Sequence, residues 1–171
     1  YDFTPSRAGA HARTFLADWQ GKLVTDDYSG YKQSFKQAGV TEIACMAHAR
    51  RKFYELHVAN QSEIAAQALA SFKALYAIEA EAKDLTAKER EQRRQEKARP
   101  ILEKLHDWML AQRTLVPDGS GTAKALDYSL KRWAALTRYL EDGYVPIDNN
   151  HIEQQIRPLA LRRKNWLFAG S

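Results

Sequence analysis

The sequence is poor in the features that mark several common classes of protein. It has one cysteine, Cys45, among 171 residues, which excludes an internal disulfide framework and is typical of a reducing compartment. No apolar run approaches the ~20 residues that a membrane-spanning helix needs, and no segment reads as a secretory signal peptide. We therefore expect a cytoplasmic protein that does not cross a membrane.

The sequence also shows no internal repeat and no low-complexity linker. With 44% hydrophobic residues it can bury a core, which predicts one domain, or one domain that carries an insertion. The formal net charge is +5, a mild basic bias that admits nucleic acid as a partner without requiring it. Because the chain begins at Tyr1 rather than at Met, we expect it to be a portion of a longer protein.

The first quarter of the chain alternates between helix and strand patterns. A helix is predicted in "AGAHARTFLADW", with one apolar face formed by Ala10, Phe15, Leu16 and Trp19. "KLVT" and "EIACMA" read as short strands, and the segment between them reads as a turn and a short helix. Strands separated by helical segments predict a parallel sheet of the α/β class.

The middle of the chain reads as helical. Residues 62–85 place an apolar face at helical spacing, formed by Ile64, Ala68, Leu69, Phe72, Leu75 and Tyr76. Thr86 and Glu89 predict a capping box for the next helix. Its run "KEREQRRQEKAR" has charges of both signs and predicts a solvated surface, and Pro100 should kink or restart the helix.

A further amphipathic helix is predicted over residues 123–143. Its inward positions are Leu126, Leu130, Trp133, Leu136 and Leu140. The whole pattern predicts three regions: a first part of an α/β core (1–58), a helical insertion (59–145) and a return to the core (146–171).

Two acids stand where an active site could form. Asp26 directly follows an apolar strand, and ligands of open α/β sheets gather beyond the carboxyl ends of strands. The alternative is that Asp26 and Asp27 form a polar turn. Glu153 lies in "DNNHIE", where Asn150 and Glu153 could instead form a capping box, or Asp148 or Asn149 could cap the helix.

Other polar residues admit two interpretations as well. Cys45 and His48 have the spacing of half a zinc site, but no second Cys or His pair completes it. We therefore interpret Cys45 as a buried packing residue of the strand, and His48 as a hydrogen-bonding or DNA-facing residue near the acidic site. Two clusters contain almost only positive charges: Arg50, Arg51 and Lys52, and Arg157, Arg162, Arg163 and Lys164. Such clusters are suited to contact phosphates, and the alternative is that they are solvated surface.

Together these segments resemble the insertion-sequence-sixty-six family of bacterial transposases. The resemblance rests on "LVTDDYSGY", "CMAHARRKF", "RWAALTRYLEDG" and above all "IDNNHIEQQIRPLALRRKNWLFAGS". It implies an RNase H-like catalytic core, here partial, in which Asp26 matches the second Asp and Glu153 the Glu of an Asp-Asp-Glu (DDE) triad. No residue of this chain matches the first Asp, and Asp27 stands where relatives often have a small residue.

The resemblance also implies a chemistry and partners. Asp26 and Glu153 would hold two Mg²⁺ (or Mn²⁺) ions, with carboxylates within roughly 8 Å of each other, since hard ions prefer oxygen ligands. His48, Asn149 and Asn150 would not bind the ions themselves but would hold the metal-binding side chains in place. The expected partners are DNA, as transposon ends and target, and a further copy of the protein in a homo-oligomer.

Two other functions fit the same residues. A non-catalytic DNA-binding or assembly module of a transposase-like protein would bind DNA without regard to Mg²⁺. An RNase H-like nuclease or resolvase would cleave nucleic acid without joining ends.

Overall fold

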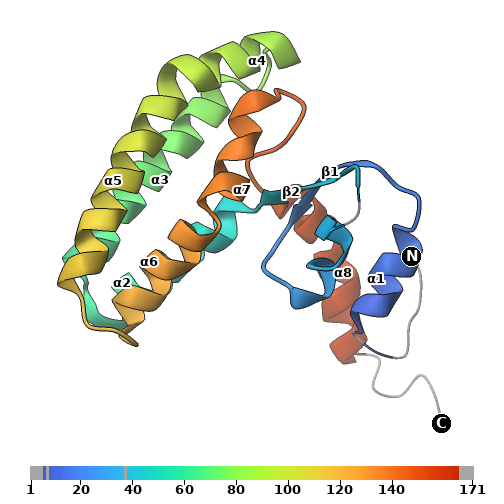
Figure 1. Ribbon diagram of the computed structural model, residues 1–171, viewed down its shortest axis with the longest axis horizontal. Helices are drawn as coiled ribbons and strands as arrows, with labels where there is room; N and C mark the ends of the chain where they lie inside the picture. The colour runs from blue at the N-terminus through green and yellow to red at the C-terminus, as the bar shows by residue number, and fades with distance from the viewer. Residues whose placement is uncertain (1–5, 7, 37, 166–171) are drawn as a thin grey trace.

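The protein is mostly helical and has one small parallel sheet. The computed structural model describes residues 6, 8–36 and 38–165, with residues 159–165 described by their backbone alone. A long group of packed helices, α2 to α7, extends from a smaller part that holds the sheet, α1 and α8 (Figure 1). None of the helices in the described residues is both long and apolar enough to span a membrane.

The sheet consists of β1 (Gly21–Thr25) and β2 (Val40–Ala44), which run parallel in the register Gly21↔Val40 to Thr25↔Ala44. The chain crosses between them through two 3₁₀ turns, η1 (Ser29–Tyr31) and η2 (Ser34–Lys36). The predicted parallel pairing of these two strands is confirmed. Both strands end at the same edge, so the residues that follow them are neighbours in space.

Helix α1 (Gly9–Phe15) is shorter than the sequence predicted. Leu16 is buried at 8% exposure, but Phe15 is 76% and Trp19 41% exposed. The predicted apolar face is therefore wrong for these two aromatic residues. Because the helix ends at Phe15, Trp19 lies outside it and cannot belong to an apolar face of the helix.

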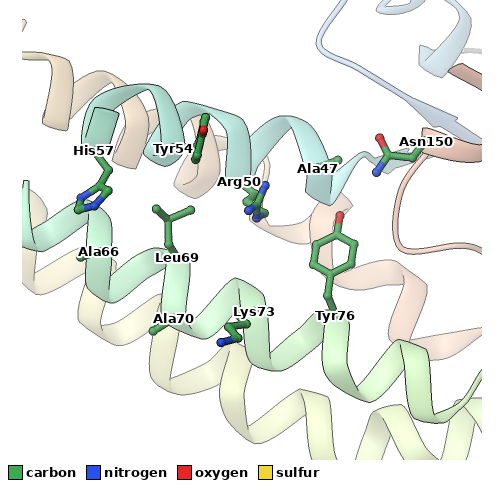
Figure 2. A pocket seen from close by; sticks show the side chains of 10 residues that line it. All are labelled: Ala47, Arg50, Tyr54, His57, Ala66, Leu69, Ala70, Lys73, Tyr76 and Asn150. Atoms are coloured by element: carbon green, nitrogen blue, oxygen red, sulfur yellow. The ribbon is translucent and has the colours of Figure 1, made fainter. Parts of the chain in front are cut away.

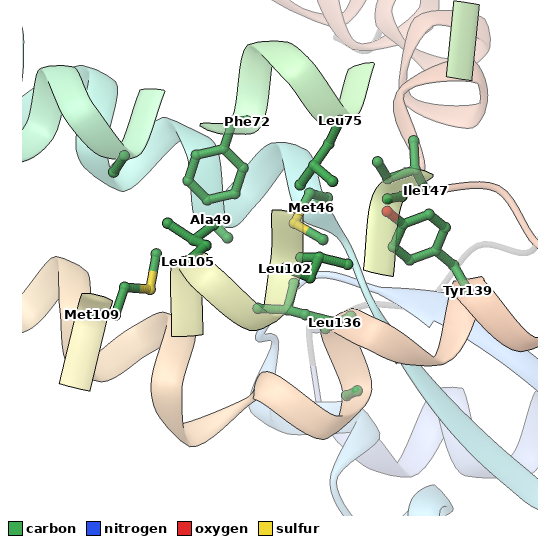
Figure 3. Close-up of a cluster of buried hydrophobic side chains, with 14 of the residues drawn as sticks. Met46, Ala49, Phe72, Leu75, Leu102, Leu105, Met109, Leu136, Tyr139 and Ile147 are labelled. Carbon is green, nitrogen blue, oxygen red and sulfur yellow. The ribbon is translucent and has the colours of Figure 1, made fainter. Parts of the chain in front are cut away.

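The helical part is built around one core. Helices α2 (Met46–Asn60) and α3 (Glu63–Glu81) pack against α5 (Arg99–Leu115) and α6 (Gly121–Lys131). Figure 3 shows the side chains that meet there, among them Met46, Phe72, Leu102, Met109 and Leu136. The face predicted for residues 62–85 supplies Ala68, Phe72 and Leu75 to this core.

The segment around Pro100 forms a nearly continuous helix. The predicted capping box is confirmed: Thr86 accepts from the amide of Glu89, whose side chain accepts from the amide of Thr86. Helix α4 (Ala87–Arg93) continues through a π-helical turn, η3 (Arg94–Ala98), into α5, with Pro100 in its first turn. The wider turn before Pro100 removes the need for the amide that proline lacks.

The helix predicted over residues 123–143 is broken, so this prediction is wrong in part. Helix α6 ends at Lys131, α7 (Trp133–Thr137) follows, and a 3₁₀ turn, η4 (Arg138–Glu141), completes the segment. The break is at Arg132, with φ −110° and ψ 12°. The inward positions Leu126, Leu136 and Leu140 are nevertheless buried as predicted. The chain then returns through the buried Ile147 to α8 (Asn150–Asn165).

The charged run of α4 and η3 is not a purely solvated surface. Arg94 is buried, at 1% exposure, and its guanidinium donates to both carboxylate oxygens of Glu79, at 2.8 and 2.7 Å. It also donates to the carbonyl oxygens of Tyr139, Asp142 and Val145. The prediction was wrong here because a mixed charge run on a helix does not show which one of its members turns inward.

Replacing Arg94 with Ala should destabilise the protein strongly. The substitution leaves the half-buried Glu79 without its cation and removes one donor from each of three carbonyl groups, which costs about 3–5 kcal/mol. Urea denaturation would measure this loss. The neighbouring Arg93, which pairs with the exposed Glu81, provides the matched control: Arg93→Ala should cost less than about 1 kcal/mol. Equal effects of both substitutions would contradict the assigned role of Arg94.

Candidate active site

The site lies where the two strands end and the chain returns to the core. The amide of Cys45, just after β2, donates to the carbonyl oxygen of Thr25 at the end of β1, at 3.0 Å. The next amide, that of Met46, donates to the carbonyl oxygen of Ile147, at 3.1 Å. These two bonds bring the residues after β1 next to the start of α8.

A cavity of about 680 Å³ opens at this junction. Asp26 and Glu153 both line it, together with Asp148, Asn149 and His151. Its apolar wall comes from β1 and from exposed residues of the return segment and α8, namely Leu23, Val24, Tyr144, Pro146, Ile152 and Ile156. The fold therefore places the two carboxylates chosen from the sequence, 127 positions apart, on one cavity.

Asp26 and Asp27 point to different partners. One carboxylate oxygen of Asp26 accepts from the amide of Tyr28, at 3.0 Å, so the predicted polar turn is present. Asp26 still lines the cavity, whereas the exposed Asp27 lies 3.4 Å from the guanidinium of Arg132 and does not line it. Turn formation and a place on the cavity are thus compatible for Asp26.

The start of α8 is ordered by Asp148. Its carboxylate accepts from the amide of Asn150 at 3.0 Å, from the Asn150 side chain at 2.8 Å and from the hydroxyl of Tyr76 at 2.6 Å. Burial and this last hydrogen bond raise the pKa of Tyr76, so its hydroxyl stays a donor.

The backbone of α8 corrects the capping prediction. The carbonyl of Asn149 accepts from the amide of Glu153 at 3.0 Å, which makes Asn149, not Asn150, the residue that precedes the helix. The side chain of Asn150 is bonded to Asp148, so the alternative capping box of Asn150 and Glu153 is wrong. Glu153 is left on the first turn, where it lines the cavity.

His48 is the neighbour of Glu153 on the α2 side. Its Nε2 lies 3.7 Å from a carboxylate oxygen of Glu153. The other ring nitrogen, Nδ1, is buried and has no hydrogen-bond partner among the described residues. Only Nε2 of the imidazole is therefore near the carboxylate of Glu153.

Cys45 contributes a hydrogen bond rather than a metal ligand. Its thiol donates to the side-chain oxygen of Asn149, at 2.9 Å, which fixes the residue before α8. Burial raises the pKa of Cys45, so the thiol keeps its proton. The expectation that Cys45 is a buried packing residue is confirmed.

The fit to magnesium is partial. Two carboxylates on one cavity supply the oxygen ligands that Mg²⁺ prefers. Within the part of the chain that the structure describes, however, no three side chains of His, Cys, Asp or Glu gather in a group that could hold a metal ion. Asp148 lines the cavity too, but both its oxygens are used by Tyr76 and Asn150.

The basic residues of α2 do not form one patch. Arg50, Arg51 and Lys52 are all exposed, but Arg50 lies over the ring of Tyr54 and Lys52 over that of Tyr128 in α6. Lys52 stands one turn after His48 on the same face of α2, which is the face toward Glu153.

The second basic cluster is described only in part. Arg157 is exposed on α8, one turn after Glu153. The side chains of Arg162, Arg163 and Lys164 lie outside the described residues.

One residue of the site was missed by sequence reasoning. Arg132, at the break between α6 and α7, donates to the carboxylate of Glu42 at 2.6 Å and to the carbonyl oxygen of Asp26 at 3.3 Å. It also pairs with Asp27. The amphipathic pattern around Arg132 did not indicate this role, because the local sequence does not show which distant residues an arginine will contact. Arg132 ties the helical part to the turn that carries Asp26.

Comparison with known proteins identifies the family of the chain. The family model "Transposase IS66 family" matches residues 1–171. The chain belongs to the IS66 transposase family. Two relatives from Sinorhizobium fredii, the uncharacterized proteins y4hP and y4qI, are 35% and 37% identical over all of this chain. The chain spans about a third of their length, 34% and 33%. No solved structure matches this IS66-family chain.

The burial of Cys45 makes a direct prediction about its reactivity. With a raised pKa and 1% exposure, the thiol should be alkylated by iodoacetamide at pH 8 far more slowly in the native protein than in urea. Mass spectrometry of the peptide that contains Cys45 measures the rate. Fast labelling of the native protein would contradict the bond between Cys45 and Asn149.

Proposed function

We propose that this chain is part of the catalytic domain of a DDE transposase, which cleaves DNA strands and joins them to a target. The observation that carries the proposal is the shared cavity: Asp26 from the end of β1 and Glu153 from the first turn of α8 both line it. Membership of the IS66 family supports the same function. In this proposal the sheet and α8 belong to an RNase H-like core, and residues 59–145 are a helical insertion.

Asp26 and Glu153 would hold Mg²⁺ or Mn²⁺. When bound, two such ions stabilise the attacking and the leaving oxygen of a phosphodiester exchange. Asp26 is fixed for this by its turn and by the contact of Arg132 with its carbonyl oxygen. Glu153 is fixed by the hydrogen-bonded start of α8, in which Asp148, Asn149 and Asn150 take part, and by His48.

A third carboxylate is required by the same proposal. We do not assign this role to Asp148, because no three possible ligands gather in the described residues and Asp148 holds the start of α8. We assign the role to a segment outside these residues, since the relatives are about three times as long as this chain. Two observations support a place for such a segment. In the described residues β1 pairs with β2 alone, and Ile152 and Ile156 of α8, which line the same cavity as β1, are 58% and 45% exposed.

Asp26→Asn and Glu153→Gln in the full-length protein should each reduce cleavage and strand transfer on transposon-end DNA to background. Each substitution keeps the size of the side chain and removes the charge that an ion would need. Gel analysis of labelled end DNA with Mg²⁺ measures both steps.

Asp27→Asn is the matched control, because Asp27 pairs with Arg132 instead of lining the cavity. It should retain activity above that of the Asp26 variant. Full activity of both Asp26→Asn and Glu153→Gln would refute the catalytic proposal.

Lys52 is exposed and shares the face of α2 with His48, the neighbour of Glu153, so we expect it to contact a phosphate near the cavity. Lys52→Ala should weaken DNA binding uniformly across sequences and reduce the slope of log affinity against log salt by about 1. Titrations at several salt concentrations measure the slope. Glu55→Gln, also on the exposed surface of α2, is the control and should not reduce the slope, because an acidic side chain makes no phosphate contact. An unchanged slope for Lys52→Ala would exclude the contact.

A second function is favoured by one observation. Because no three ligands gather in the described residues, a non-catalytic DNA-binding or assembly module is the alternative. It predicts DNA binding that is indifferent to Mg²⁺ and to the substitutions at Asp26 and Glu153.

A further inference from the structure

A second cavity lies on the other side of α2, between α2 and α3. It has a volume of about 600 Å³, within the range of about 300–1,000 Å³ of sites that bury a small ligand. Its floor is apolar and is formed by Ala47, Leu69 and neighbouring alanines, and Tyr54 and Tyr76 present their rings to it (Figure 2). We call this cavity the α2–α3 groove.

The described residues that line the groove include basic side chains and no acidic ones. The basic ones are Arg50, His57 and Lys73. Arg50 lies over the ring of Tyr54, with the guanidinium carbon 5.8 Å from the ring centre, and Tyr54 is 51% exposed. An apolar floor with the exposed ring of Tyr54, the cations Arg50 and Lys73 and, among the described lining residues, no acid suits a ligand that combines flat rings with negative charge.

The groove ends at the start of α8, next in the chain to residues that line the candidate active site. Asn150 forms one of its ends, beside Tyr76 and Ala47, as Figure 2 shows. Asn150 is bonded to Asp148, and Asp148 and Asn149 line the cavity that holds Asp26 and Glu153. The start of α8 thus separates the acidic cavity from the groove, and a strand that crosses it would pass from one to the other.

We propose that the α2–α3 groove binds unpaired nucleotides of the DNA strand next to the scissile phosphate. Bases would stack on Tyr54 and the apolar floor, and phosphates would contact Arg50 and Lys73. The volume of about 600 Å³ is that of a small-ligand site, so the groove suits single bases rather than a whole duplex. This inference rests on the proposed function and specifies the form of its substrate.

The proposal can be tested by DNA binding with the full-length protein, without divalent cations so that no cleavage occurs. The two probes are a blunt duplex and the same duplex with a short unpaired flank, compared by fluorescence anisotropy. The wild type should bind the flanked duplex about tenfold more tightly, as expected when a stacked base is added. 2-Aminopurine in the flank should change its emission on binding.

Two variants should remove this preference and leave blunt-duplex affinity within about twofold, since they alter the groove alone. Ala70→Trp fills the groove, and Lys73→Glu reverses a charge in it. Their matched controls, Ala111→Trp and Lys104→Glu, lie on exposed positions of α5 away from the groove and should keep the preference. Tyr54→Phe should retain the preference that Tyr54→Ala loses.

Each result decides between the two proposals. If the wild type binds both duplexes equally, or if Ala70→Trp and Lys73→Glu keep the preference, the groove proposal is overturned while catalysis by Asp26 and Glu153 is untouched. If Ala70→Trp changes the assembly state and keeps the preference, the groove is a contact between protein chains, which also overturns the proposal. Failure of the catalytic proposal is read separately, from cleavage by Asp26→Asn and Glu153→Gln.

Discussion

Two consecutive backbone amides hold the site together. The amide of Cys45 is bonded to Thr25, and the amide of Met46 to Ile147, so one peptide junction joins the end of β1, the end of β2 and the return segment. The thiol of Cys45 adds a third bond, to Asn149. These bonds fix the first turn of α8 against the end of β1. Asp26 and Glu153 share a cavity because the backbone, not the carboxylates themselves, brings them there.

Two arginines then secure the helical part to this junction. Arg94 binds the carbonyl groups of Tyr139, Asp142 and Val145, and so fixes the segment that leads to Ile147. Arg132 binds Glu42 of β2 and the carbonyl of Asp26. A guanidinium has five N–H donors in a fixed plane. One arginine can therefore bind several carbonyl and carboxylate oxygens that accept no hydrogen bond from a helix or a sheet. The helical part thereby helps to determine where both carboxylates lie.

The sequence predicted those features that depend on local pattern. The parallel strands, the inward face of residues 62–85 and the capping box at Thr86 all follow from spacing over a few residues. The burial of Arg94 and the contacts of Arg132 with Glu42 and Asp26 could not be predicted, because most of these acceptors lie 45 or more positions away in the chain. For the site, the resemblance gave Asp26 and Glu153, while the sequence alone left each with a structural alternative.

The start of α8 contributes lining residues to both cavities, and this has a consequence for the proposed chemistry. Asp148 and Asn149 line the acidic cavity, and Asn150 lines the basic α2–α3 groove. Negative charge at the first attracts cations, while positive charge at the second attracts the polyanion. Since the hydrogen bonds of Asp148 and Cys45 fix all three residues as a unit, a strand held in the groove would meet the acidic cavity at a set position. If both proposals hold, the segment "DNN" would lie at the boundary between where a strand is held and where it is cut, a role for its three polar residues that capping alone does not explain.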